Sequence, residues 1–580
     1  MSLTFFSSFR LAPSLFDFSS HLHSRNKKTK KKGRLATMKA LSTFLLATAI
    51  AIAMAGISAS APTPWSAADQ AAAEQAVSQL SIPQKAGRII MARFTGTDAA
   101  TQGKSQIASL YLGGVILFAD NVQSATQVAK LNADLSSAYE DLKLPGGAPL
   151  LISVDQEGGI VARVQQDAGA TEFPTFMTHG SANVSALTRA AFQASGEELL
   201  AMGFNMVAAP DADATLGPSD PTIGSRSAGT SPALVGSTVV AALSGQQNAG
   251  ILGQIKHFPG HGSVNKSSET TLPTQPASLA QLRARDLIPF QTAINAGVPS
   301  IMVAHLLVPA LDAAHPTSLS ANAIRLAREE YGFNGVLSTD SLGMGAITTQ
   351  YGNDPSGATA AVAALLAGQD LLLMPPDPAK AHAAMVRAVY GGNVPIARLD
   401  EAAVRVTALA LHSARLRAGR YGSSIGAPAV GSTVGSAAHG KTSYDASLGG
   451  LVVASGPCSG SLLPSSSSSS VQIQGGSSTS RARFTSAAQA AGLSLSSSSP
   501  TIVGLAGYGD TSFPAGTTHA VALDTPYVLG SAPNSATVRI ALFGQTPQAF
   551  QALVDVLMGK ASGAGRLPVQ VSGVQRTSCK

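Results

Sequence analysis

The chain has 580 residues, of which 45% are hydrophobic and only 12% charged, with a net charge of +7. This length exceeds what one hydrophobic core usually organises, so we expect two domains. The excess positive charge lies in residues 1–37, which carry eight Lys and Arg residues against one Asp, so the other residues sum to zero. This balance excludes a broad positive field over the globular part, and with it a general affinity for nucleic acid.

The segment 38–61 has the three-part plan of a secretory signal peptide. It begins with Met38 and Lys39, continues through an apolar core, and ends with the small residues Ser58–Ala61. A membrane anchor is the alternative, because the apolar core is near spanning length. We interpret residues 1–37 as a basic upstream extension, and we expect a secreted, extracellular protein without stable membrane insertion.

Short apolar runs then alternate with segments of helical spacing, which predicts a parallel sheet with helical crossovers. Eight such units between residues 66 and 420 predict a closed (β/α)₈ barrel of the TIM type, with an open doubly wound sheet as the alternative. The eight runs are Arg88–Phe94, Gly114–Phe118, Leu150–Asp155, Asn205–Pro210, Ile251–Phe258, Ser300–His305, Gly335–Asp340 and Asp370–Met374. Polar residues stand at their C-terminal ends, where the active sites of such barrels form.

The composition changes after this predicted barrel. Residues 421–445 are rich in Gly and Ser, which predicts a flexible linker. Residues 446–580 hold short strand-like runs, one helical segment and serine runs, which predict a smaller, sandwich-like α/β domain with Ser-rich loops. Cys458 and Cys579 both fall in this domain, either as one disulfide or as two free thiols.

Several motifs in family order resemble the family 3 glycoside hydrolases, specifically the β-N-acetylglucosaminidase (β-N-acetylhexosaminidase) branch. They are LGGVILFADN, ISVDQEGGIVARV, IGSRSAG, IKHFPGHG, IMVAHLLVPALD and YGFNGVLSTDSLGMGAI. The pairing of DQEGG with KHFPGHG is highly specific. The resemblance implies a glycosidase with a carbohydrate substrate. We expect no cofactor and no metal, because retaining hydrolysis needs neither.

The resemblance also assigns roles to residues at the strand ends. Asp340 matches the family's nucleophile, although an aspartate that caps the next helix would also fit TDSLGM. Five further residues match side chains that contact the sugar, namely Asp155, Arg163, Arg226, Lys256 and His257. The alternative for each of these five is a structural ion pair in the barrel mouth.

The acid/base of the branch is missing from its expected place. The loop after KHFPGHG carries Asp-Ser-His in this branch, whereas here the three positions read Ser267, Ser268 and Glu269. In one interpretation Glu269 is the acid/base, with a raised pKa. In a second the acid comes from another loop or from the other domain, where Asp510 and Asp524 are candidates. In a third the protein binds sugar but turns it over poorly.

From these observations we expect a secreted, exo-acting, retaining glycoside hydrolase. It would remove terminal β-linked N-acetylglucosamine through a covalent intermediate on Asp340. A β-glucosidase of the same family and a catalytically impaired carbohydrate-binding protein are the alternatives. Asn183 and Asn265 match the acceptor pattern for N-glycosylation. The sequence leaves the oligomeric state unknown.

Overall fold

The computed structural model describes residues 63–100, 102–350, 354–422, 429–464 and 470–579. These residues fall within one compact unit, 61–580. The expected upstream extension (1–37) and signal peptide (38–61) lie outside the described residues. Among the residues that are described, no helix has both the length and the apolar character needed to span a bilayer.

The eight predicted strands are confirmed and form one parallel sheet, in the order β10-β1-β2-β3-β6-β7-β8-β9. The sheet closes because Ser338 of β9 forms a parallel bridge with Leu371, which directly precedes β10. Every residue in these strands is buried, which explains why they read as continuous apolar runs rather than alternating ones. The strands are β1 (Ile90–Ala92), β2 (Gly114–Leu117), β3 (Leu151–Val154), β6 (Met206–Val207), β7 (Leu252–Phe258), β8 (Ser300–Val303), β9 (Val336–Thr339) and β10 (Leu372–Leu373).

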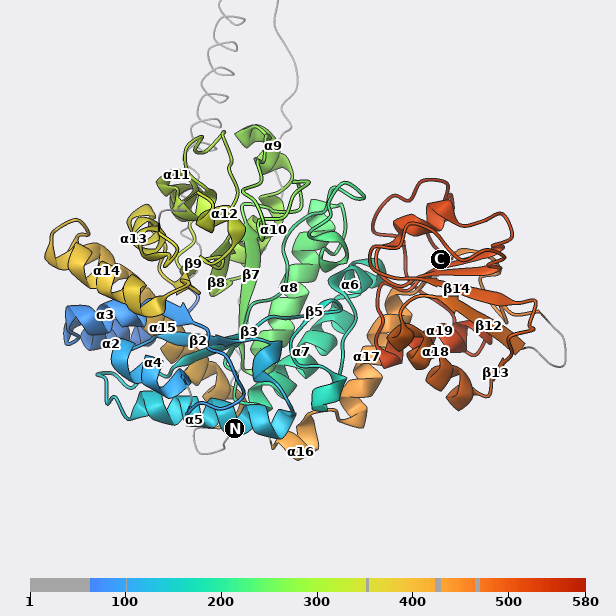
Figure 1. Cartoon of the computed structure of the whole chain (residues 1–580), viewed down its shortest axis with the longest axis horizontal. Coiled ribbons are helices and arrows are strands. Elements are labelled where there is room, and N and C mark those ends of the chain that lie inside the picture. Colours follow the sequence, from blue (N-terminus) through green and yellow to red (C-terminus); the bar gives the residue numbers. More distant parts are fainter. Residues whose placement is uncertain (1–62, 101, 351–353, 423–428, 465–469, 580) are drawn as a thin grey trace, which may run out of the picture. The chain divides into compact units, whose positions relative to one another are not determined.

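Helices alternate with these strands along the chain (Figure 1). They are α2 (Ala67–Ser78), α3 (Ile82–Arg88), α4 (Gly103–Leu110), α5 (Ala125–Glu140), α6 (Phe176–Ala182), α7 (Ser185–Ala201), α8 (Pro232–Ala249), α9 (Leu279–Ala284), α10 (Ile288–Asn295), α11 (Ala321–Arg325), α12 (Gly345–Thr348), α13 (Ala358–Ala367), α14 (Pro378–Tyr390) and α15 (Ile396–Tyr421). Residues 278–294 form two helices rather than one, because Pro289 near the start of α10 cannot continue a helix from α9. A short antiparallel hairpin, β4 (Gln156–Gly158) and β5 (Val161–Ala162), follows β3. The (β/α)₈ barrel is thus confirmed.

The second sheet has six strands in the order β11-β16-β15-β14-β12-β13, and only β11 runs antiparallel to its neighbour. Its strands are β11 (Val452–Ser455), β12 (Ser470–Gly475), β13 (Ser494–Leu495), β14 (Ile502–Ala506), β15 (His519–Ala522) and β16 (Val538–Ala541). Helices α18 (Ser478–Ala491) and α19 (Pro547–Leu557) pack against each other beside this sheet (Figure 1). The smaller α/β domain is therefore confirmed, although β12, β13 and α18 in the Ser-rich part were not anticipated.

Part of the segment expected to be a flexible linker is helical. Residues 421–445 include α16 (Val430–Thr433) and most of α17 (Ala437–Gly450), which packs against α6 and α7 of the barrel. Small residues permit this close contact, since a Cβ on Gly450 would lie 2.4 Å from the Thr178 carbonyl oxygen. Composition alone therefore misread a packed helix as a linker. The exact domain boundaries stay predictions.

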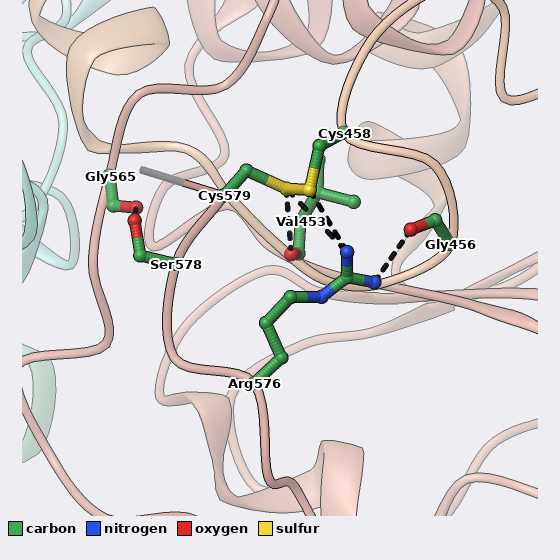
Figure 2. The surroundings of a disulfide bond; sticks show 7 residues. All are labelled: Val453, Gly456, Cys458, Gly565, Arg576, Ser578 and Cys579. Atoms are coloured by element: carbon green, nitrogen blue, oxygen red, sulfur yellow. Dashed lines mark hydrogen bonds between the residues drawn. A yellow bond between two sulfur atoms is a disulfide. The ribbon is translucent and has the colours of Figure 1, made fainter.

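Cys458 and Cys579 form a disulfide that ties the loop after β11 to the C-terminal segment. Figure 2 shows Arg576 beside it, with its guanidinium donating to the Gly456 carbonyl at 2.6 Å and to Cys458 Sγ at 2.9 Å. Of the two alternatives left open by the sequence, the disulfide is the one that the structure contains.

Candidate active site

A cavity of about 730 Å³ opens at the C-terminal ends of the barrel strands and brings together all the residues predicted for the site. The seven are Asp155, Arg163, Arg226, Lys256, His257, Glu269 and Asp340. Their convergence follows from the fold, because the carboxyl ends of parallel strands meet at one edge of a barrel. Their individual roles stay predictions, which the following contacts constrain.

Asp340 directly follows β9 and is held by the strands on both sides. Its N–H donates to the Val303 carbonyl at 3.0 Å, and the Leu342 N–H donates to the Leu373 carbonyl at 2.9 Å. His305 is fully buried and bonds to the Ser341 carbonyl at 2.9 Å, which fixes the backbone next to the carboxylate. The helix α12 is capped by Met344, so Asp340 does not cap it, and the alternative of a helix-capping aspartate is wrong.

A buried ion network forms the floor of the cavity. The Lys256 ammonium lies 2.8 Å from Asp155 and 2.7 Å from Glu157. Arg226 makes a two-pronged contact with Glu157, with N–O distances of 2.8 and 2.9 Å, and Arg163 lies 3.2 Å from Asp155. We define these five residues as the floor network. Such paired charges hold each other rigidly, and four of the five residues, all except Glu157, line the cavity.

The pKa shifts in the floor network follow from this pairing. Burial alone would raise the pKa of Asp155, but Lys256 and Arg163 outweigh burial and lower the pKa. The same competition lowers the pKa of Glu157, where Arg226 and Lys256 outweigh burial. Burial would lower the pKa of Lys256, yet the two carboxylates raise it. All three groups are therefore charged at neutral pH.

His257 is oriented by a carboxylate behind it. Its Nδ1 lies 2.8 Å from Asp213 Oδ2, and its Nε2 lies 3.3 Å from the Arg226 guanidinium. A carboxylate accepts and a guanidinium donates, so these contacts place the proton on Nδ1 and leave Nε2 as an acceptor. Burial raises the pKa of Asp213, but the hydrogen bond from His257 helps to lower it overall.

One further acid lies beside this pair. Burial and the neighbouring Asp213 raise the pKa of Asp211 well above its ordinary value. Asp211, Asp213 and His257 together have the ligand types of a metal site. However, the Arg226 guanidinium stands 3.6 Å from Asp211, and Asp213 already bonds to His257, so protein groups supply the positive charge there.

Glu269 stands on the loop between β7 and α9, at the rim of the cavity. Its side chain is partly exposed, while its backbone carbonyl accepts from the Gly345 N–H at 2.9 Å. The Ser268 carbonyl accepts from the Ala346 N–H at 3.1 Å. These bonds attach the loop to the segment that follows Asp340. Partial burial and the nearby Asp340 charge both raise the pKa of Glu269, as general acid catalysis requires.

The two serines before Glu269 have structural contacts of their own. The Ser267 hydroxyl accepts from the Glu269 N–H at 3.2 Å, and the Ser268 hydroxyl lies 3.0 Å from His261 Nε2. Burial lowers the pKa of His261 to about 4, so this imidazole is neutral in ordinary buffers. His261 therefore supports the loop rather than replacing the missing imidazole.

The acids of the second domain do not line this cavity. Asp524 is buried and accepts a hydrogen bond from the Ser225 hydroxyl. Asp510 accepts from the Gly507 N–H at 2.7 Å. Neither is among the residues around the cavity, so in the described structure Glu269 is the better-placed candidate.

Three residues of the site were not predicted from the sequence, although the position of each in the sequence points to the site. Glu157 lies within the DQEGG motif, two residues after Asp155. Asp211 and Asp213 directly follow the apolar run that became β6. Because active sites of such barrels form at the C-terminal ends of the strands, both aspartates could have been predicted from their place after this run.

Comparison with known proteins agrees with this geometry. The sequence model described as the glycosyl hydrolase family 3 N terminal domain matches residues 74–409. Beta-hexosaminidase A of Pseudoalteromonas piscicida is 36% identical over 289 residues, which cover 47% of this chain and 47% of that protein. Beta-hexosaminidase LpqI of Mycobacterium tuberculosis is 30% identical over 324 residues, which cover 54% of this chain and 79% of that protein. The chain thus spans about half the length of the first relative and about four fifths of the second.

Solved structures extend the likeness to the second domain. A glycoside hydrolase family 3 β-N-acetylglucosaminidase from Paenibacillus sp. str. FPU-7 superposes with a TM-score of 0.75 at 28% identity, covering 86% of this chain and all of that one. A β-N-acetylhexosaminidase from Beutenbergia cavernae covers 57% of this chain with a TM-score of 0.53 at 29% identity.

Proposed function

The chain belongs to glycosyl hydrolase family 3 and is a glycosidase, and on this premise we propose a specific reaction for it. It removes terminal β-linked N-acetylglucosamine from a carbohydrate, with retention of the anomeric configuration. The choice of sugar is supported by the relatives, which are β-hexosaminidases and a β-N-acetylglucosaminidase. We propose Asp340 as the nucleophile and Glu269 as the acid/base.

One observation carries this assignment. Asp340 and Glu269 line the same cavity, and the Asp340 charge helps to raise the pKa of Glu269. A retaining glycosidase needs this division, with one carboxylate ionised for attack and the other protonated for donation.

The reaction then proceeds in two balanced steps. Asp340 attacks the anomeric carbon while Glu269 gives its proton to the glycosidic oxygen, so the bond between that carbon and that oxygen breaks and a neutral alcohol leaves. The Glu269 carboxylate next takes a proton from water, whose oxygen attacks the anomeric carbon and releases the Asp340 carboxylate. The floor network and His257 bind the sugar hydroxyls and hold the ring for both steps.

We also propose that the protein works outside the cell. The predicted signal peptide supports this, and so does the disulfide between Cys458 and Cys579, since disulfides persist in oxidising compartments.

A sugar-binding protein with little turnover is the second candidate. The observation that favours it is the exposure of the Glu269 side chain, because water competes with substrate for a proton donor at an open rim. A β-glucosidase is the remaining alternative.

The test is an assay of the secreted chain on 4-nitrophenyl β-N-acetylglucosaminide and β-glucoside, with Asp340→Asn as control. We expect turnover of the first substrate that the control abolishes, and NMR of the first-formed sugar should show the β anomer. Turnover of the glucoside alone would identify a β-glucosidase. Binding of N-acetylglucosamine without turnover would favour the binding protein. An α anomer as first product would reject the covalent intermediate.

A further inference from the structure

The loop that carries Arg226 is attached to the second domain. Arg226 lies in the short 3₁₀ helix η3 (Gly224–Arg226), within the connection between β6 and α8. Ser225, its immediate neighbour, donates its hydroxyl proton to Asp524 of the second domain. Further along the same loop, the Thr230 N–H donates to the Pro568 carbonyl at 3.2 Å.

The surfaces fit closely at these points. A Cβ on Gly229 would lie 2.7 Å from the Pro568 carbonyl oxygen, and one on Gly224 would lie 3.5 Å from Thr525 Cγ2. Gly229 also has a φ of 150°, a conformation that other residues rarely adopt. The loop therefore follows the surface of the second domain on both sides of Arg226.

The bond between Ser225 and Asp524 is shielded from water. Ser225 is 1% exposed and Asp524 is 5% exposed. A hydrogen bond to a carboxyl group in such surroundings is costly to break, because the partner left behind stays buried and unsatisfied. Loss of this bond is thus expected to move η3 rather than be repaired by solvent.

Movement of η3 would reach the sugar site directly. The Arg226 guanidinium bonds to Glu157 at 2.8 and 2.9 Å and contacts His257 at 3.3 Å. These contacts form only if the backbone of Arg226 keeps its position relative to the barrel. Small displacements of a binding group have large effects on affinity and rate.

We propose that Asp524 is a positioning residue of the active site, through which the second domain holds Ser225 and thereby sets Arg226 against the bound sugar. This inference rests on the proposed function, in which Arg226 contacts substrate. It assigns the second domain a part in substrate binding without requiring it to supply the catalytic acid.

The experiment uses the full chain with Asp524→Ala, Ser225→Ala and the double variant. We expect KM for the N-acetylglucosaminide to rise about 10-fold in each, with kcat changed by less than about 3-fold, because an interaction present in both ground and transition states is lost. The double variant should be no worse than either single one. Asp524→Asn keeps an acceptor oxygen and should restore KM to near the wild-type value.

Ser181→Ala is the matched control. It also removes one hydrogen bond between the barrel and the following segment, from the Ser181 hydroxyl to the Gly450 carbonyl at 2.7 Å. Ser181 is not among the residues that line the cavity. We expect it to lower the melting temperature without raising KM, which separates positioning from general loosening.

A binding measurement separates this inference from the proposed function. The dissociation constant of N-acetylglucosamine, measured by calorimetry, should rise by the same factor in Ser225→Ala and Asp524→Ala whether or not the chain turns over substrate. An unchanged dissociation constant and KM in folded Ser225→Ala would overturn the inference even if the wild type is fully active. A rise of equal size in Ser181→Ala would overturn it as well.

Discussion

The two ends of the segment 256–273 are held in the structure in different ways. At one end the side chain of Lys256 is 4% exposed and lies between two carboxylates. His257 is likewise buried and bonded to Asp213. At the other end Glu269 is exposed, and only its backbone is tied down, by the bond from Gly345.

This difference explains how a catalytic position can change while its fold persists. Replacing Lys256 would leave Asp155 and Glu157 buried with too few partners, which costs several kcal/mol. Replacing Glu269 removes no contact that holds the loop. The first end is therefore constrained by folding and the second by chemistry alone. A different acid/base residue at position 269 is compatible with an unchanged barrel.

The largest effect that we expect comes from Glu269→Gln. Without a proton donor, kcat for N,N′-diacetylchitobiose should fall about 10³-fold, because its leaving alcohol needs protonation. The 4-nitrophenyl substrate should lose less than about 10-fold in the first step, because nitrophenolate leaves unaided. Stability should change by less than about 0.5 kcal/mol, since the side chain is exposed.

The pH profile gives the control for this variant. Because partial burial and Asp340 raise the pKa of Glu269, the wild type should keep its acid protonated to a higher pH than an ordinary glutamic acid. The alkaline limb of kcat/KM should therefore disappear in Glu269→Gln. Equal loss on both substrates, or no loss on either, would reject Glu269 as the acid.

At the buried end of the segment we expect Lys256→Met to lower stability, whereas Glu269→Gln leaves stability almost unchanged. Both carboxylates lose a shared cation, so the free energy of unfolding should fall by about 3 kcal/mol, measured by urea denaturation. Lys266→Met is the matched control, because Lys266 is exposed on the same segment. Equal losses in the two variants would show that Lys256 is held no more tightly than the exposed Lys266.

What could be predicted from the sequence follows the same division. Buried parallel strands leave continuous apolar runs, so the barrel could be recognised, and strand ends such as Asp155 and Asp340 could be placed at one edge. The pairing of Glu157 with Lys256 and Arg226 could not, because it depends on side chains from three segments that lie far apart in the chain. Likewise α17 is invisible to composition, since its small residues matter only against the barrel surface that receives them.

The attachment of the Glu269 loop is tested by Gly345→Ala. A Cβ there would lie 2.6 Å from the Thr270 carbonyl oxygen and 2.8 Å from that of Glu269, so the loop must shift. We expect kcat on N,N′-diacetylchitobiose to fall roughly 10-fold with little change in KM. Gly419→Ala, where no atom lies within 4 Å of the added Cβ, is the control. An unchanged kcat would mean that the loop adjusts freely.

The smallest effect concerns a paired charge outside the site. His439 on α17 lies 2.9 Å from Glu198 and 3.4 Å from Glu197 of α7, where Arg420 also contacts Glu197 at 3.1 Å. Burial would lower the pKa of His439, but the two glutamates outweigh burial and raise the pKa to about 9.

The contact of His439 with these two glutamates is expected to contribute to the stability of the fold and not to catalysis. The folded-state pKa of about 9 exceeds the ordinary histidine value of 6.5, so the stabilisation is fully present below pH 6.5 and is lost as the pH rises through 9. We expect a loss of about 1 kcal/mol over that window, since solvent partly screens the pair. His439→Gln should remove this part of the pH dependence of urea unfolding while leaving kcat unchanged. A variant with the wild-type slope between pH 6.5 and 9 would show that the imidazole carries no such charge, and that burial rather than pairing decides its state.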